Sequence, residues 1–211
     1  MRIKQFTAEL IGTFALVFIG AGAGALGAGG LVGVAFAHGL TLMVMIYVFG
    51  KISGTHINPA VTFGVALAGA IEWSRALIYW AAQAVGGILA GAALFYILGG
   101  SETGLGATVL AEGVSPIQGL VLEAILTFFL VNSVLHAAVD GKAGDFAGLA
   151  IGSTLVFAIL MGGPLTGASL NPARTLGPAV FTGTLSVFWI YLVGTFTGAA
   201  AAVGVFKGLK G

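Results

Sequence analysis

Two asparagines begin matching segments of the chain and have the chemistry of fixed hydrogen-bond donors. Asn58 and Asn171 are each followed by Pro-Ala, and the chain contains only three asparagines. Asparagine is a preferred N-cap because its side-chain oxygen accepts from the first backbone N–H groups of a helix, and proline is favoured at the next position. With that oxygen occupied, the amide NH₂ of each residue faces the space ahead of its helix. We expect both amides to hold a small hydrogen-bond acceptor there.

Few other side chains have a type and position suited to chemistry. Arg174 follows Asn171 by three residues, where its guanidinium would bind oxygen atoms and repel cations. Glu9 and Glu123 lie in apolar segments, where an ionisable group is a functional candidate such as a proton carrier. The three histidines lack metal-ligand spacing, cysteine is absent, and no serine or threonine belongs to a recognisable triad. We predict no catalytic residue, no metal and no cofactor.

The composition places these side chains in a membrane. Of the 211 residues, 58% are hydrophobic and 7% are charged, whereas a soluble domain carries about 25% charged residues. Six spanning helices of about 20 residues each would use nearly all the apolar positions. The eight Lys and Arg residues are scattered and the net charge is +1, which excludes nucleic acid as a partner.

Runs without charged residues predict six spanning helices, and no cleavable signal peptide precedes them. Two more apolar segments are too short to cross a hydrocarbon core of about 30 Å, so we predict them as re-entrant half-helices at residues 58–70 and 171–181. The six spans are predicted at residues 6–26, 33–50, 75–98, 117–138, 146–162 and 187–206.

The charge distribution predicts the orientation in the bilayer. An even number of spans places both termini on one side of the membrane. If that side is the cytoplasm, the external connections carry only three charged residues, Glu102, Glu112 and Arg174. The chain is therefore predicted to be a multi-pass protein of the plasma membrane with cytoplasmic N- and C-termini. The basic residues assigned to the cytoplasmic side are Arg2, Lys4, Lys51, Arg75, Lys142, Lys207 and Lys210.

The two halves of the chain repeat each other. Residues 53–67 and 166–180 share seven identities in 15 positions at a constant offset of 113 residues. Each half holds three spans, an odd number, so the halves must have opposite orientations and their half-helices must meet near the midplane. Two helix N-termini would then repel cations there. We predict one all-α membrane domain, residues 1–211, with inverted repeats at about 1–105 and 115–211.

These motifs make the chain resemble the aquaporin, or major intrinsic protein, family over essentially its whole length. The resemblance is carried by residues 53–62 and 166–175 and by the glutamates of the first and fourth spans. It implies a right-handed bundle of six tilted helices, a homotetramer with one pore per subunit, and passive flow of water or small neutral solutes. It also implies that backbone N–H groups of the re-entrant loops bind the two glutamates. The implied supports of the loops are Glu9, Glu123, Pro59 and Pro172.

The resemblance also implies an outer constriction made of His38, Ile159, Ala168 and Arg174. Orthodox water channels have Phe and His at the first two positions, so this set resembles plant vacuolar-type aquaporins instead. Ile159 removes a polar group facing Arg174 and His38 restores one from another side, which makes ammonia a candidate besides water. Loop carbonyls should line one wall of the pore. The further predicted pore residues are Thr55, His56, Ile57, Gly167, Ser169 and Leu170.

Two alternatives to a water pore are open at this point. A glycerol facilitator of the same family would have Asp at the position of Thr175 and a basic residue near Ala179. A proton-coupled secondary transporter of a small solute is also built from inverted repeats, and it would use Glu9 and Glu123 as proton carriers. The transporter predicts saturable uptake driven by a pH gradient, whereas a pore gives flux linear in the gradient. An enzyme has the least support.

Overall fold

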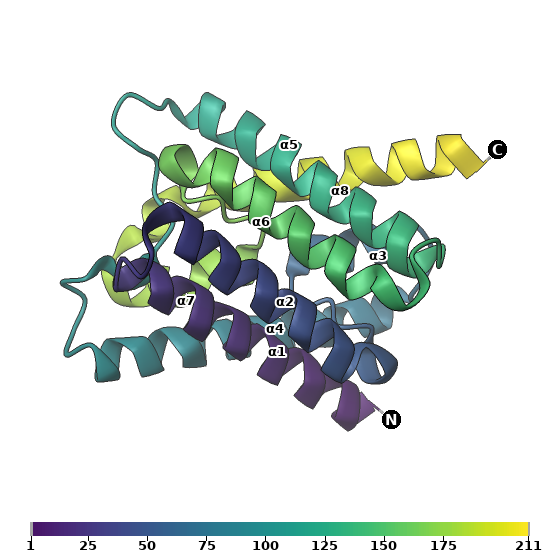
Figure 1. Ribbon diagram of the computed structural model, residues 1–211, viewed down its shortest axis with the longest axis horizontal. Helices are drawn as coiled ribbons and strands as arrows, with labels where there is room; N and C mark the ends of the chain where they lie inside the picture. Colours follow the sequence, from purple (N-terminus) through teal and green to yellow (C-terminus); the bar gives the residue numbers. More distant parts are fainter. Residues whose placement is uncertain (1, 211) are drawn as a thin grey trace.

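The computed structural model describes residues 2–210 as an all-helical chain (Figure 1). The predicted domain, residues 1–211, exceeds this described part by one residue at each end. Six helices are long and apolar enough to span a membrane, as predicted. These are α1 (Arg2–Ala25), α2 (Gly30–Ser53), α4 (Trp73–Ile97), α5 (Pro116–Ser133), α6 (Ala147–Thr166) and α8 (Phe188–Lys210). Shorter turns form at η1 (Gly104–Gly106), η2 (Val134–Val139), η3 (Gly144–Phe146) and η4 (Thr184–Val187).

Several spanning helices run further than predicted. Helix α2 covers residues 30–53 instead of 33–50, and α6 ends at Thr166 instead of 162. The reason is a left-handed glycine after each helix: Gly54 (φ 89°) donates to the Gly50 carbonyl, and Gly167 (φ 77°) donates to the Gly163 carbonyl. Both glycines belong to the repeated motif, so each helix ends where its copy of the motif begins.

The two predicted half-helices are α3 (Pro59–Leu67) and α7 (Pro172–Thr182). At 1.5 Å per residue, nine and eleven residues are too few to cross a bilayer. Helix α3 ends three residues earlier than predicted because the chain turns at Gly69, which has φ 83°. In Figure 1, α3 lies toward the end of the bundle that carries both chain termini, and α7 lies toward the opposite end.

Pairs of helices approach through glycine backbones, which brings the half-helices against the spans. A Cβ atom on Gly152 of α6 would lie 2.6 Å from the Gly39 carbonyl oxygen of α2, and the reverse distance is the same. A Cβ atom on Gly177 of α7 would collide with the Gly87 carbonyl of α4. Side chains are excluded from both contacts, as is common where membrane helices pack closely.

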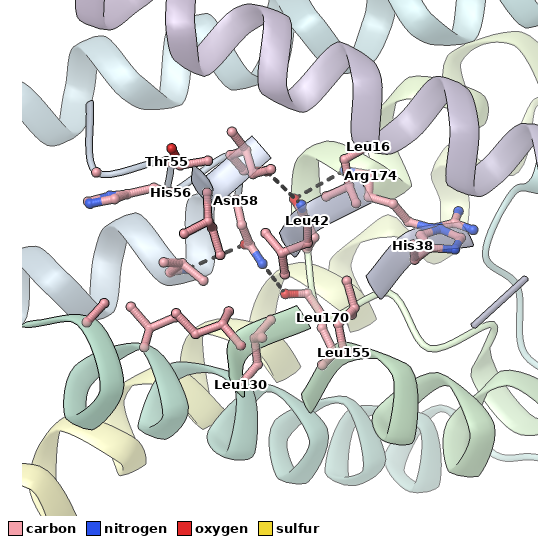
Figure 2. A pocket seen from close by; sticks show the side chains of 18 of the residues that line it. Leu16, His38, Leu42, Thr55, His56, Asn58, Leu130, Leu155, Leu170 and Arg174 are labelled. Atoms are coloured by element: carbon pink, nitrogen blue, oxygen red, sulfur yellow. Dashed lines mark hydrogen bonds between the residues drawn. The ribbon is translucent and has the colours of Figure 1, made fainter. Parts of the chain in front are cut away.

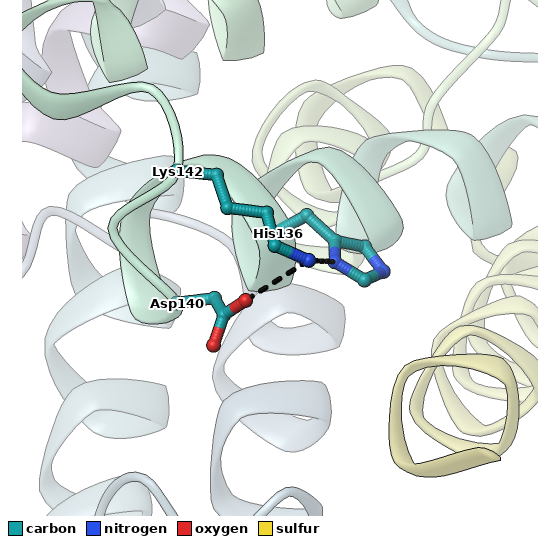
Figure 3. A network of polar contacts seen from close by, with 3 residues as sticks. All are labelled: His136, Asp140 and Lys142. Carbon is teal, nitrogen blue, oxygen red and sulfur yellow. Dashed lines mark hydrogen bonds and ion pairs between the residues drawn. The ribbon is translucent and has the colours of Figure 1, made fainter. Parts of the chain in front are cut away.

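Helix α5 continues into the π-helical turn η2, which joins the interior of the bundle to a polar loop. Val134 and Ala138 of this segment face the central cavity described below. Beyond the turn, the Lys142 ammonium lies 3.1 Å from an Asp140 carboxylate oxygen and 3.3 Å from His136 Nδ1 (Figure 3). The Lys142 side chain is 63% exposed, so this cluster contributes little to stability.

Candidate functional site

A small cavity lies between the loop before α3 and the loop before α7. Its volume is about 40 Å³, and a cavity needs about 10–15 Å³ to hold one water. Figure 2 shows His56 toward one end, Asn58 near the middle, and His38 with Arg174 at the other end. The cavity has room for a row of a few water molecules.

The cavity has both apolar and polar lining. Four leucines from four spanning helices, namely Leu16, Leu42, Leu130 and Leu155, line it together with the two loops (Figure 2). The sequence did not single out these leucines, because every span is rich in aliphatic residues at all helical positions. The loops contribute the predicted lining residues Thr55, His56, Ile57, Ser169 and Leu170.

The two asparagines are N-caps, and they also link the two loops. Asn58 Oδ1 accepts from the backbone of Ala60, and Asn171 Oδ1 accepts from that of Ala173. The sequence predicted that both amide hydrogens would face open space, and this is wrong for one of the two. Each amide donates across to the other loop, to the Leu170 oxygen at 2.8 Å from Asn58 and to the Ile57 oxygen at 2.9 Å from Asn171. One N–H of each amide remains for a bound molecule.

The backbone of both loops is held in an unusual conformation. Thr55 and Ile57 have φ values of 51° and 40°, and Ala168 and Leu170 have 43° and 52°. The left-handed region is uncommon for residues other than glycine, and each such residue costs about 1–3 kcal/mol. The strain occurs at the same positions of both repeated motifs. Its effect is to turn successive peptide groups so that the Ile57 and Leu170 carbonyls meet the asparagines.

Two buried glutamates hold these strained segments. Glu9 on α1 and Glu123 on α5 have no exposed surface, and each carboxylate accepts two consecutive backbone N–H groups of one loop. Backbone without regular structure needs such partners at membrane depth. The Glu9 oxygens lie 2.9 and 2.6 Å from the backbone nitrogens of His56 and Ile57. The Glu123 oxygens lie 2.9 and 2.8 Å from those of Ser169 and Leu170.

Further supporting residues were not found from the sequence. The Ser53 and Thr166 hydroxyls each donate to the glutamate of their half at 2.7 Å. The Tyr79 and Tyr191 hydroxyls donate to the carbonyls of those same two residues, at 2.6 and 2.7 Å. The signal was available, since both pairs recur at offsets of 112–113 residues. Gln83, which donates to Glu9 at 2.8 Å, breaks the pattern because threonine stands at residue 195.

Arg174 and His38 meet at one end of the cavity (Figure 2). Arg174 is 4% exposed and donates through Nη1 to the Gly106 carbonyl at 2.6 Å. Within residues 2–210, no carboxylate lies at ion-pair distance from it, so its positive charge is not neutralised by a direct partner. His38 Nδ1 lies 2.9 Å from the Val34 carbonyl oxygen, which can only accept, so Nδ1 carries the proton and Nε2 is an acceptor.

Three predicted pore residues do not line this cavity. Ile159 and Ala168 are buried in the apolar interior, at 2% and 1% exposure, and Gly167 caps α6. Membership of Ile159 and Ala168 in the constriction therefore stays a prediction from the family pattern. Pro59 and Pro172 occupy the first position of α3 and α7, as predicted.

Six spans, two half-helices joined at their N-termini and a central cavity define an integral, multi-pass membrane protein of the channel class. The chain belongs to the major intrinsic protein family, whose model matches residues 1–206. It is 42% identical over 210 residues to Aquaporin NIP1-3 of Oryza sativa subsp. japonica, covering 97% of this chain and 73% of that one. It is 43% identical over 216 residues to Aquaporin TIP1-2 of Zea mays, covering 96% and 84%.

Structural comparison gives the same architecture. The chain matches the X-ray structure of the aquaglyceroporin from Plasmodium falciparum with a TM-score of 0.86, over 98% of this chain and 96% of that one. The two sequences are 24% identical, so this likeness defines the fold. As an aquaporin-family protein, the chain is a passive membrane channel for water or small solutes and not an enzyme.

Proposed function

We propose that this channel conducts water in single file, admits ammonia as a second small neutral permeant, and excludes protons and ions. The observation that carries the proposal is the cavity of about 40 Å³ between His56 and Arg174. It is lined by hydrogen-bonding groups of the two loops and by leucines of the spanning helices. Such a lining replaces only part of the hydrogen bonds of a passing water, which favours movement over tight binding.

The middle of the cavity is suited to orient water. Asn58 and Asn171 each keep one amide N–H after donating to the opposite loop. A water that accepts from both has its oxygen occupied and cannot relay a proton through that atom. The N-termini of α3 and α7 add partial positive charge at the same place. Protons and cations are therefore opposed at the asparagines and again at Arg174.

The outer filter in this proposal consists of His38 and Arg174, with Ile159 and Ala168 as its further members. Arg174 offers N–H donors to the lone pair of a permeant such as water or ammonia. The His38 ring bounds the same end of the cavity, with its Nε2 buried and without a partner among the described residues. Replacing His38 or Ile159 by Ala is expected to change the ranking of ammonia, urea and glycerol fluxes while water flow persists. An identical ranking in both variants would place the filter elsewhere.

The transporter alternative needs Glu9 and Glu123 to exchange protons with the permeant path. Both carboxylates are fully buried, and neither lines the cavity. Their oxygens are bound by N–H and O–H donors of the loops, which favours a structural role over a carrier role. We therefore assign them, with Pro59 and Pro172, as supports of the loops.

The proposed setting is a homotetramer in the plasma membrane with both termini cytoplasmic. Both ends of the chain lie at the same end of the bundle (Figure 1), and the positive-inside rule orients that end by its Lys and Arg residues. Four copies are proposed from the family pattern. Light scattering combined with size-exclusion chromatography in detergent would measure the number of copies, and a monomer mass would contradict it.

The test of the function is stopped-flow light scattering on proteoliposomes after an osmotic step with an impermeant solute, repeated at several temperatures. A water pore gives fast shrinkage with a low activation energy, and the flux grows linearly with the gradient. Ammonia and glycerol are then ranked in the same vesicles. Shrinkage no faster than that of protein-free liposomes, with folded and inserted protein, would contradict the proposal.

A further inference from the structure

The imidazole of His38 lies between helix α1 and the cavity. Its Nδ1 is tied to the Val34 carbonyl of its own helix, one turn back. The side chain is 3% exposed, yet it lines the cavity at the end where Arg174 also lies (Figure 2). The ring therefore has helix α1 on one side and the water path on another, and its position affects the width of that path.

On the α1 side the ring rests on a glycine. A Cβ atom added to Gly20 would lie 2.5 Å from His38 Nε2 and 2.6 Å from Cγ, and it would also collide with Cδ2. Three atoms of one ring thus occupy the space where any other residue would place its side chain. The contact is with the imidazole itself and not with a flexible chain end, so the ring can yield only by moving as a whole.

We propose that Gly20 is a positioning residue of the outer constriction, because its missing side chain lets the His38 ring lie back against α1 and keeps the water path open. This inference rests on the proposed water pore and deepens it. A methyl group at this position would push the ring away from α1. The ring would break its bond to Val34 or enter the cavity beside Arg174, and both outcomes change the constriction.

The same contact explains the polarity of the filter. With Nδ1 fixed as the donor to Val34, Nε2 holds the free lone pair, and it is buried without a partner among residues 2–210. On the α1 side it faces Gly20, whose added Cβ atom would lie 2.5 Å from it. Because Nε2 is buried there, Arg174 supplies the polar group that lines this end of the cavity. Gly20 thereby sets both the width of the constriction and the balance of donors and acceptors in it.

The chain provides a matched control one turn along the same helix. A Cβ atom on Gly24 would make only ordinary contacts, at 3.6 Å from Gly106 Cα and 4.0 Å from Val34 Cγ1. Gly20→Ala and Gly24→Ala therefore change helix α1 by the same methyl group and the same gain in helix propensity. Only the first of the two touches the His38 ring.

The experiment is a double-mutant cycle measured by stopped-flow light scattering on proteoliposomes. In the natural background, Gly20→Ala is expected to lower water permeability per channel about tenfold, which corresponds to a barrier higher by about 1.4 kcal/mol. Gly24→Ala is expected to leave it unchanged. In a His38→Ala background the ring is gone, so adding Gly20→Ala is expected to have no further effect.

Three results would overturn the assignment of Gly20. These are an unchanged permeability in Gly20→Ala, an equal loss in Gly24→Ala, or a loss that persists in the His38→Ala background. If Gly20→Ala does not fold, the double variant decides: recovery of fold and flux on removing the ring supports the contact, and continued failure contradicts it. Absence of water flux in the unmodified protein would instead contradict the proposed pore.

Discussion

At the scale of single residues, the site depends on carboxylates that the permeant does not touch. The Glu9 carboxylate accepts hydrogen bonds from two backbone N–H groups, a serine hydroxyl and the amide of Gln83, with donor–acceptor distances of 2.6–2.9 Å. Glu123 accepts from two backbone N–H groups and a threonine hydroxyl, and it has no counterpart of the Gln83 amide. A carboxylate oxygen only accepts, so every one of these donors is satisfied by the two oxygens of one side chain. The loops before α3 and α7 keep their strained shape because each is anchored at two successive nitrogens.

Replacing Glu9 by Gln is expected to abolish water flux and to destabilise the protein. The new NH₂ would replace one of the two oxygens and face the backbone N–H that this oxygen accepts. A buried donor left without a partner costs about 1–3 kcal/mol, so the two opposed donors cost about 2–6 kcal/mol. Thermal unfolding in detergent and stopped-flow permeability measure the two effects. Glu102→Gln, in an exposed loop, serves as the control. A stable Glu9→Gln protein with normal water flux would refute the anchoring role.

Replacing Asn171 by Asp is expected to increase proton and cation leak. The carboxylate can still cap α7, because capping needs only an oxygen acceptor. It cannot donate to the Ile57 carbonyl, and it brings negative charge to the middle of the cavity. Such a charge attracts a cation about 4 Å away by about 4 kcal/mol at an effective dielectric of 20, so a leak at least tenfold higher is expected.

A pH-sensitive dye inside proteoliposomes would measure this leak after a pH step. The matched variant is Asn58→Asp, which makes the same change in the other loop and is expected to act in the same direction. If neither variant leaks more than the unmodified protein, the central barrier does not depend on the asparagines.

The sequence predicted the residues of the site better than their contacts. Asn58, Asn171 and Arg174 stand out because of residue type and repetition. The bonds from each asparagine to the opposite loop could not be predicted, since they join residues 112 and 114 positions apart and depend on how the two half-helices meet. The recess that holds the His38 ring likewise exists only once α1 and α2 have packed.

At the scale of elements, helix α3 has a cation at the end remote from the asparagines. Lys207 on α8 donates to the carbonyl oxygen of Leu67, the last residue of α3, at 3.0 Å. The final carbonyls of a helix lack partners within it, and a positive charge suits that end of the helix dipole. Helix α7 ends differently, at Gly183, which takes φ 74° as its cap.

Replacing Lys207 by Met is expected to lower the free energy of unfolding by about 0.3–1 kcal/mol, because the C-terminal end of α3 would lose the ammonium group bound to it. The apolar stem is kept, so packing of α8 changes little. The control is Lys142→Met, an exposed lysine in a weak surface cluster (Figure 3). Melting temperatures of the two variants in the same detergent would be compared. Equal values would show that the bond to Leu67 does not stabilise the protein.

The elements themselves were largely predictable, and their ends were not. Six long apolar runs and two short ones define eight helices because length and the absence of charge decide that question. The termini of α2 and α6 depend on glycine caps, and α6 continues through Pro164 in its last turn. The π-helical turn after α5 leaves no pattern in the sequence that we can identify.

At the scale of the whole molecule, the orientation in the bilayer can be tested directly because the chain has no cysteine. We expect Glu112→Cys to react with a membrane-impermeant maleimide in intact cells. Lys142→Cys is expected to react only after permeabilisation, because it lies in a loop assigned to the cytoplasm. The reverse pattern would invert the proposed topology.

The hydrogen bonds that cross between the two loops also constrain the order in which the chain can fold. When residues 1–105 have entered the membrane, the Ile57 carbonyl and the Asn58 amide still lack the partners that lie beyond residue 169. Unpaired polar groups at that depth cost several kcal/mol. The first loop therefore gains these two bonds only after the loop before α7 has been synthesised and inserted. Pairing of the two loops, on which the cavity depends, is thus a late step of assembly.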